Sequence, residues 1–181
     1  MSGLVIAFSG RISSGKSTLS QEVALALGLP RVSFGEGVRT AARRAGIPET
    51  RESLQALGES LVATDPIGFT RSVLAQTAFN SGTSLIVDGI RHVEVLSILR
   101  SLCAPSAVRM ILLEVDDQLR YDRSRERGRA GDLGGAVDAH STETQVSRLK
   151  SEADLVLNGG RPSDELVAIV RSHVLAEWAG T

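Results

Sequence analysis

One stretch of this sequence has the residue types and spacing to bind phosphate. The residues 10–17, Gly-Arg-Ile-Ser-Ser-Gly-Lys-Ser, fit the pattern G-x-x-x-x-G-K-[S/T] between an apolar run and a helical pattern. Glycines let the backbone turn so that several N–H groups point at an anion. We expect Lys16 to reach the β- and γ-phosphates of ATP and the Ser17 hydroxyl to ligate Mg²⁺. The expected nucleotide contacts are Gly10, Ser13, Ser14, Gly15, Lys16, Ser17 and Thr18.

Lysine is almost absent from the chain. Lys16 and Lys150 are the only lysines, and arginine provides nearly every other cation. A compact ammonium on a flexible stem fits between two phosphates, where a planar guanidinium does not. Lysine at position 16 therefore favours phosphate binding over an incidental glycine-rich turn.

A carboxylate follows the apolar stretch 85–87. Asp88 stands where an acid can hold Mg²⁺ or its water shell opposite the Ser17 hydroxyl. Gly89 would permit close approach of a ligand, and Arg91 would enter the same cleft. The alternative is that Asp88 only caps a following helix.

Apolar runs that alternate with helical patterns predict the elements that position these residues. The expected strands are 4–8, 31–33, 85–88, 109–115 and 153–157. Strands that alternate with helices form βαβ units, which predict an α/β fold with a five-stranded parallel sheet between two helix layers. Ligands of such sheets bind beyond the carboxyl ends of the strands, so the loops after these strands are expected to line one cleft.

Two segments interrupt this alternation. Residues 34–82 contain helical patterns without a convincing strand, punctuated by Gly46-Ile47-Pro48 and Asp65-Pro66, and predict a helical insertion. Residues 128–137 contain four glycines and predict a mobile loop. Thr142 and Gln145 resemble a capping box that restarts a helix near Glu143.

Several motifs together resemble the nucleoside monophosphate kinases of the adenylate kinase type. They are the phosphate-binding loop, Ser-x-Gly-acid-x-x-Arg at 33–39 and Asp-Gly-Ile-Arg at 88–91. The stretch 50–58 is closer to the phage-type deoxynucleoside monophosphate kinases. The resemblance implies one P-loop three-layer sandwich over 1–181, with an acceptor-binding insertion at about 34–82 and a lid at about 124–141. It also implies transfer of the γ-phosphoryl group of Mg-ATP to a nucleoside or deoxynucleoside monophosphate.

The same resemblance implies which side chains hold the acceptor. Arg39 and Arg91 would grip its phosphate, and guanidinium forks do neutralise phosphate charge bidentately. Glu36, Arg51 and Gln55 are further candidate contacts in the insertion. Arg51 is equally well explained as a solvated helix charge.

The densest cluster of charge lies before the glycine-rich loop and comprises Arg120, Arg123, Arg125, Arg127 and Arg129. In the resembled family, arginines at the entry to the lid contact adenine and the transferring phosphates, and Arg123 and Arg127 match them. Asn158 would lie under the adenine ring. A solvated basic helix face and a plain Asn-Gly turn are the respective alternatives.

Composition narrows the class of protein. The chain has 181 residues, 42% of them hydrophobic, a net charge of −1 and only 3% aromatic residues, which argues against a nucleic-acid partner. Cys103 is the only cysteine, so a reducing, cytoplasmic setting is expected. No apolar run is long enough for a membrane span. The histidines, His92, His140 and His173, are interpreted as surface or packing residues, and a homodimer stays open.

Two other functions remain open at this stage. A kinase for a hydroxyl acceptor, such as dephospho-coenzyme A, a small metabolite or a modified DNA base, needs a general base, and Glu36 could serve. A nucleotide-binding switch without catalysis needs only the phosphate-binding loop. Base and sugar specificity cannot be read from the sequence.

Overall fold

A parallel five-stranded sheet lies at the centre of the computed structural model, which describes residues 3–126, 128 and 141–179. The strand order is β2-β3-β1-β4-β5, and every neighbouring pair is parallel. The strands are β1 (Leu4–Gly10), β2 (Arg31–Ser33), β3 (Leu85–Ile90), β4 (Ala107–Glu114) and β5 (Leu155–Asn158). All five predicted strands are therefore present, each within a few residues of its expected bounds.

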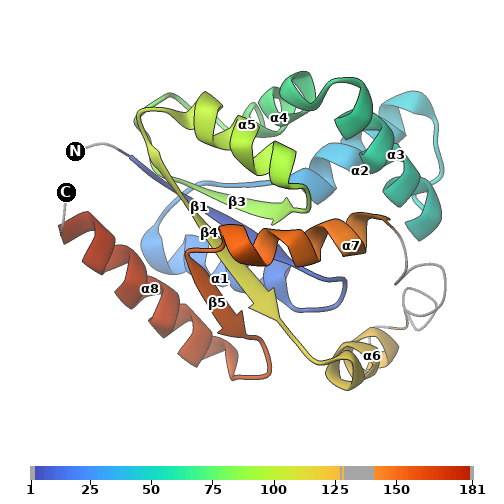
Figure 1. Ribbon diagram of the computed structural model, residues 1–181. Coiled ribbons are helices and arrows are strands. Elements are labelled where there is room, and N and C mark those ends of the chain that lie inside the picture. The colour runs from blue at the N-terminus through green and yellow to red at the C-terminus, as the bar shows by residue number, and fades with distance from the viewer. Residues whose placement is uncertain (1–2, 127, 129–140, 180–181) are drawn as a thin grey trace.

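Helices cover both faces of this sheet (Figure 1). On one face lie α1 (Lys16–Leu27) and α8 (Ser163–Ala179), and on the other lie α4 (Pro66–Leu74) and α5 (Val93–Cys103). The remaining helices are α2 (Phe34–Ala45), α3 (Arg51–Thr64), α6 (Asp117–Glu126), α7 (Ser141–Arg148) and the short 3₁₀ helix η2 (Leu149–Glu152). The predicted three-layer sandwich is confirmed.

The central strand β1 shows why the strands are apolar throughout. Successive side chains of a strand point to opposite faces of the sheet. Val5 and Ala7 therefore join the core under α4 and α5, whereas Ile6 and Phe8 join the core under α1 and α8. Both faces are covered, so no position of β1 is exposed.

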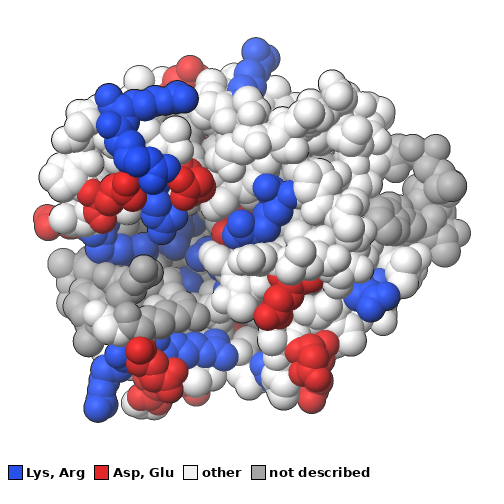
Figure 2. Space-filling view, turned by 180° about the vertical axis from the view of Figure 1, so that it is seen from behind, with Lys and Arg blue, Asp and Glu red and all other residues white. Residues whose placement is uncertain are grey.

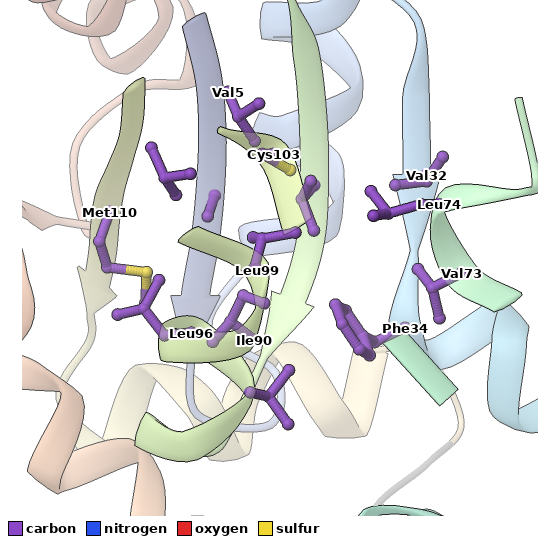
Figure 3. Close-up of a cluster of buried hydrophobic side chains, with 14 of the residues drawn as sticks. Val5, Val32, Phe34, Val73, Leu74, Ile90, Leu96, Leu99, Cys103 and Met110 are labelled. Atoms are coloured by element: carbon purple, nitrogen blue, oxygen red, sulfur yellow. The ribbon is translucent and has the colours of Figure 1, made fainter. Parts of the chain in front are cut away.

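The core under α5 also holds the only cysteine. Figure 3 shows Leu96, Leu99 and Cys103 of α5 directed at Val5 and Met110 of the sheet. Burial raises the pKa of the Cys103 thiol to about 11, so this thiol stays protonated near neutral pH and behaves as a small apolar side chain.

The segment between β2 and β3 forms the predicted helical insertion, made of α2, α3 and α4. Gly46, in a left-handed conformation with φ 67°, ends α2. Asp65 caps α4 by accepting a hydrogen bond of 2.8 Å from the Gly68 N–H, and Pro66 occupies the first turn, where it is tolerated.

The predicted lid at about 124–141 lies mostly outside the described residues. On either side of it, α6 ends at Glu126 and α7 begins at Ser141, just before the helix start expected near Glu143. Within the part of the chain that the structure describes, no helix combines the length and apolarity that a bilayer crossing requires.

Candidate active site

The phosphate-binding loop, residues 10–17, joins the carboxyl end of β1 to the start of α1. Ser13 and Gly15 take positive φ angles of 61° and 94°, and α1 begins at Lys16 directly after Gly15. A Cβ atom on Gly10 would lie 2.8 Å from the carbonyl oxygen of Leu113, so only glycine fits there. The N-terminus of α1 supplies backbone N–H groups and a positive dipole end, which suit an anion.

Two arginines of α6 bind the outer side of this loop. Arg120, whose side chain is 1% exposed, donates from Nε to the Ile12 carbonyl at 2.9 Å and from Nη1 to Asp117 at 2.6 Å. Arg123 donates from Nη1 to the Ser14 carbonyl at 2.9 Å and from Nη2 to the Gly159 carbonyl at 2.8 Å. These contacts tie α6, the loop and the end of β5 together.

The three predicted adenine contacts, Arg123, Arg127 and Asn158, differ in where the structure places them. Arg123 lies beside the phosphate-binding loop, but in this structure its guanidinium is engaged with the two backbone carbonyls of Ser14 and Gly159. Arg127 lies outside the described residues. Asn158 accepts a hydrogen bond of 2.9 Å from the Gly160 N–H, the geometry of the turn that was its alternative interpretation. The roles of Arg123, Arg127 and Asn158 toward a nucleotide stay predictions.

Asp88 lies inside β3 with its carboxylate buried. Its Oδ2 atom accepts hydrogen bonds from Arg31 Nη2 at 2.6 Å and from Ser33 Oγ at 3.4 Å. Its Oδ1 atom is buried and has no hydrogen-bond partner in the part of the chain that the structure describes. Because α5 begins at Val93 with His92 as its N-cap, Asp88 does not cap that helix.

A cavity of about 180 Å³ opens at the carboxyl ends of β1, β2 and β3. It is lined by predicted residues from four separate parts of the chain, namely Lys16, Ser17, Arg39, Arg51, Gln55, Asp88 and Arg91. Apolar side chains, among them Phe34 and Phe69 in an edge-to-face pair, form other parts of its wall. The structure thus brings the predicted donor and acceptor groups into one cavity.

Glu36 is the predicted acceptor contact that does not line this cavity. Its carboxylate forms ion pairs with Arg43 and, at 3.7 Å, with Arg39. The Ser33 hydroxyl accepts a hydrogen bond from the Glu36 backbone N–H and so caps α2. Glu36 therefore belongs to a surface ion-pair network, and its role toward a substrate stays a prediction.

One face of α3 lines the cavity with polar side chains. Arg51, Gln55 and Glu59 follow each other at intervals of four residues and therefore share this face. Gln55 is only 9% exposed, and its buried Nε2 atom has no hydrogen-bond partner within residues 3–126 and 141–179. A buried amide donor of this kind normally has a partner, so it is available to a bound molecule.

His92 also lines the cavity, although the sequence had indicated a surface or packing residue. Burial lowers the pKa of His92, the nearby Glu59 carboxylate raises it, and the neighbouring Arg91 lowers it. The net effect is a pKa below the ordinary value of histidine. His92 is therefore mostly neutral at neutral pH.

Among the described residues, the loops predicted to line one cleft contribute to two separate hollows. The cavity lies at the ends of β1, β2 and β3, whereas a second hollow lies at the ends of β4 and β5 and includes Arg11, Asn158 and Arg161. Figure 2 shows Lys and Arg side chains gathered in a hollow of the surface, with Asp and Glu side chains nearby.

Curated relatives decide the family. No family model matches the chain. A UPF0200 protein of Methanoregula boonei is 31% identical over 172 residues, which cover 92% of this chain and 93% of the relative. A UPF0200 protein of Hyperthermus butylicus is 32% identical over 132 residues, covering 71% and 68%. The chain belongs to the UPF0200 family. That family name states no activity.

Solved structures place this UPF0200 protein in the P-loop kinase fold. A shikimate kinase of Acinetobacter baumannii in complex with shikimate matches with a TM-score of 0.62 at 14% identity, over 97% of this chain and 94% of that chain. A gluconokinase of Sinorhizobium meliloti matches with a TM-score of 0.56 at 18% identity, over 92% and 87%. At such identities the similarity shows the fold alone. The predicted fold class is confirmed, but the resemblance to nucleoside monophosphate kinases is not.

Sequence reasoning missed three polar residues of this UPF0200 site. Arg31 binds Asp88, while Glu59 and His92 line the cavity. Glu59 has a local signal, since it follows Gln55 by one helical turn on the predicted insertion. Arg31 has no such signal in the sequence, because its contact with Asp88 depends on how β2 pairs with β3.

Proposed function

We propose that this UPF0200 protein is an ATP-dependent phosphotransferase that moves the γ-phosphoryl group of Mg-ATP to a nucleoside or deoxynucleoside monophosphate. The observation that carries the proposal is that the cation of the phosphate-binding loop and arginines from other segments line one cavity. Lys16 lines it from the phosphate-binding loop, whereas Arg39 and Arg91 line it from α2 and the end of β3. Cations from two sides suit two phosphates that must approach each other.

The donor half of the cavity also fits a magnesium ion. Within the described residues, no three acidic, histidine or cysteine side chains gather into a metal site of their own. A magnesium ion that accompanies ATP needs only one or two protein groups, because phosphates and waters supply the rest. Asp88 and Ser17 both line the cavity, and the Asp88 Oδ1 atom, which has no hydrogen-bond partner among the described residues, and the Ser17 hydroxyl are suitable groups. When bound, the ion neutralises negative charge on the phosphates.

The acceptor half suits an anionic acceptor rather than a hydroxyl. A hydroxyl must lose its proton to a general base, whereas a phosphate oxygen needs none. The carboxylates that line the cavity are Asp88, which is held by Arg31, and Glu59. The carboxylate after β2, Glu36, is paired with arginines instead. Arg39, Arg51 and Arg91 neutralise an acceptor phosphate and orient it.

A hydroxyl acceptor is the second candidate. It is favoured by the similarity of the fold to a shikimate kinase and a gluconokinase. In that reaction Glu59 or Asp88 would accept the hydroxyl proton, since both line the cavity.

A panel of acceptors with Mg-ATP tests the proposal through release of ADP. The panel contains ribo- and deoxyribonucleoside monophosphates, and shikimate, gluconate and dephospho-coenzyme A as hydroxyl acceptors. We expect turnover with at least one monophosphate and none with the hydroxyl compounds. Turnover with hydroxyl compounds alone would support the second candidate, and tight ATP binding without any turnover would support a nucleotide-binding switch.

The chain offers a matched control for the donor site in its other lysine. Lys16→Ala removes the ammonium that lines the cavity, and we expect it to abolish turnover. Lys150→Ala removes an exposed ammonium that pairs with Glu114 at 2.9 Å, and we expect it to retain turnover. Equal activity of the two variants would contradict the assignment of Lys16.

A further inference from the structure

A partly buried ion pair lies beside the groups that fit magnesium. Arg31 Nη2 donates to Asp88 Oδ2 at 2.6 Å, and the Arg31 and Asp88 side chains are 26% and 4% exposed. Ser33 Oγ lies 3.4 Å from the same Oδ2 atom. Both contacts of the carboxylate thus fall on Oδ2, and the buried Oδ1 atom keeps its accepting capacity.

The same guanidinium reaches the first turn of α1. Arg31 Nε donates to Ser20 Oγ at 2.9 Å, and Ser20 Oγ in turn donates to the Ser17 carbonyl at 3.0 Å. Ser17 carries the hydroxyl that fits the metal. One arginine therefore links the strand that carries Asp88 with the helical turn that carries Ser17.

The pairing of β2 with β3 places Arg31 for this role. Ser33 lies opposite Asp88, and Arg31 lies opposite Ile86. Arg31 and Ser33 are two residues apart in one strand, so their side chains share a face of the sheet. A long side chain at such a diagonal position reaches its neighbour on the next strand, and Arg31 does so at Asp88.

We propose that Arg31 is a positioning residue that holds Asp88 and Ser17 in the relative arrangement required by magnesium-bound ATP. The inference rests on the proposed function. Arg31 occupies one carboxylate oxygen and leaves the other for the metal or its water shell. Groups that orient metal ligands from behind affect metal affinity strongly. A planar guanidinium supplies separate donors in a fixed fork, which a lysine ammonium cannot copy.

Binding of a non-hydrolysable ATP analogue by calorimetry, with Mg²⁺ and with EDTA, tests this role without turnover. The ratio of the two affinities measures the contribution of the metal. In Arg31→Ala we expect this ratio to fall by about 10- to 100-fold. Affinity in EDTA should change little, because Arg31 donates its hydrogen bonds to Ser20 and Asp88, which act on the metal side of the site. The ratio for Arg31→Lys should lie between those of the wild type and Arg31→Ala.

Two further variants separate positioning from general stability. Arg100→Ala removes another arginine ion pair, with Glu152 at 2.7 Å, remote from the cavity, and should leave the ratio unchanged. Arg31→Ala added to Asp88→Asn should lower the ratio no further than Asp88→Asn alone, if Arg31 acts through Asp88. If Arg31→Ala lowers the ratio as much in the Asp88→Asn protein as in the wild type, the proposal is overturned.

Failure of the inference and failure of the proposed function give different results. If the wild-type protein binds the analogue equally with Mg²⁺ and with EDTA, the proposed function fails. If the wild type shows the metal effect and Arg31→Ala retains it, Arg31 has no positioning role. If Arg31→Ala does not fold by circular dichroism, Arg31→Lys and Ser20→Ala provide the same comparison. If both Arg31→Lys and Ser20→Ala have the same affinity ratio as the wild type, the proposal is likewise overturned.

Discussion

Arg120 donates a hydrogen bond of 2.9 Å from Nε to the carbonyl oxygen of Ile12, so this buried side chain of α6 supports the phosphate-binding loop directly. Arg123 does the same for the carbonyl of Ser14. Carbonyl oxygens that are held by α6 cannot turn towards a bound phosphate, which they would repel. The loop is thereby held with its N–H groups available for the anion.

We expect Arg120→Ala to lower the free energy of unfolding by about 2 to 3 kcal/mol, because the Ile12 carbonyl loses its charged donor. The affinity for ATP should fall as well, since the loop loses its support. Urea unfolding and calorimetric ATP titration measure the two effects. Arg125→Ala, an exposed position on the same helix, is the control and should change neither quantity. Unchanged stability of Arg120→Ala would contradict a supporting role.

The acceptor site yields a matched pair of arginines on α2. Both pair with Glu36 and Glu49, but Arg39 lines the cavity and Arg43 does not. If Arg39 binds the acceptor phosphate, Arg39→Ala should raise the acceptor KM by about tenfold or more, because charge-assisted hydrogen bonds are lost. Arg43→Ala should leave the KM near the wild-type value. Steady-state kinetics at saturating ATP distinguish the two, and equal KM values for both variants would count against Arg39.

The sheet and the phosphate-binding loop could be predicted because their signals are local. Leu85, Ile86 and Val87 are continuous and apolar because helices cover both faces of β3. Only β2 gave a weak signal, since it has three residues and a single buried one, Val32. The spacing of the glycines with Lys16 carries its own structural context, a strand before and a helix after.

Residues whose roles depend on tertiary contacts were predicted less well. Arg120 belongs to a run of arginines that is equally typical of a solvated basic helix face, and only its packing against Ile12 shows otherwise. Arg31 and Asp88 are 57 positions apart, and their contact requires the pairing of β2 with β3. Glu36 matches a family pattern, but its carboxylate pairs with Arg39 and Arg43, which follow it on the same face of α2.

The lowered pKa of His92 predicts how stability depends on pH. The unfolded chain binds a proton at this histidine at a higher pH than the folded protein does, so protonation favours unfolding. The contribution of His92 is complete above about pH 6.5 and is lost as the pH falls below that value. In urea unfolding, the wild type should lose more stability than His92→Gln between about pH 7.5 and 5.5. Parallel pH profiles of the two proteins would contradict the burial of a neutral imidazole.

Gln55 offers a test in which stability and substrate binding change in opposite directions. Its buried Nε2 atom has no hydrogen-bond partner among the described residues, so Gln55→Leu removes an uncompensated polar group from the cavity wall. We expect the free energy of unfolding to rise by about 1 kcal/mol. The acceptor KM should rise too, if the amide donates to the acceptor.

Gln76 is the matched control for this substitution. Its amide bonds both the N–H and the carbonyl of Ser33, each at 2.9 Å, so Gln76→Leu should lower the stability that Gln55→Leu raises. Urea unfolding and steady-state kinetics of both variants give the comparison. A Gln55→Leu variant of lower stability and unchanged acceptor KM would show that the amide serves the fold rather than the substrate, because an amide reserved for a ligand contributes nothing to the unliganded protein.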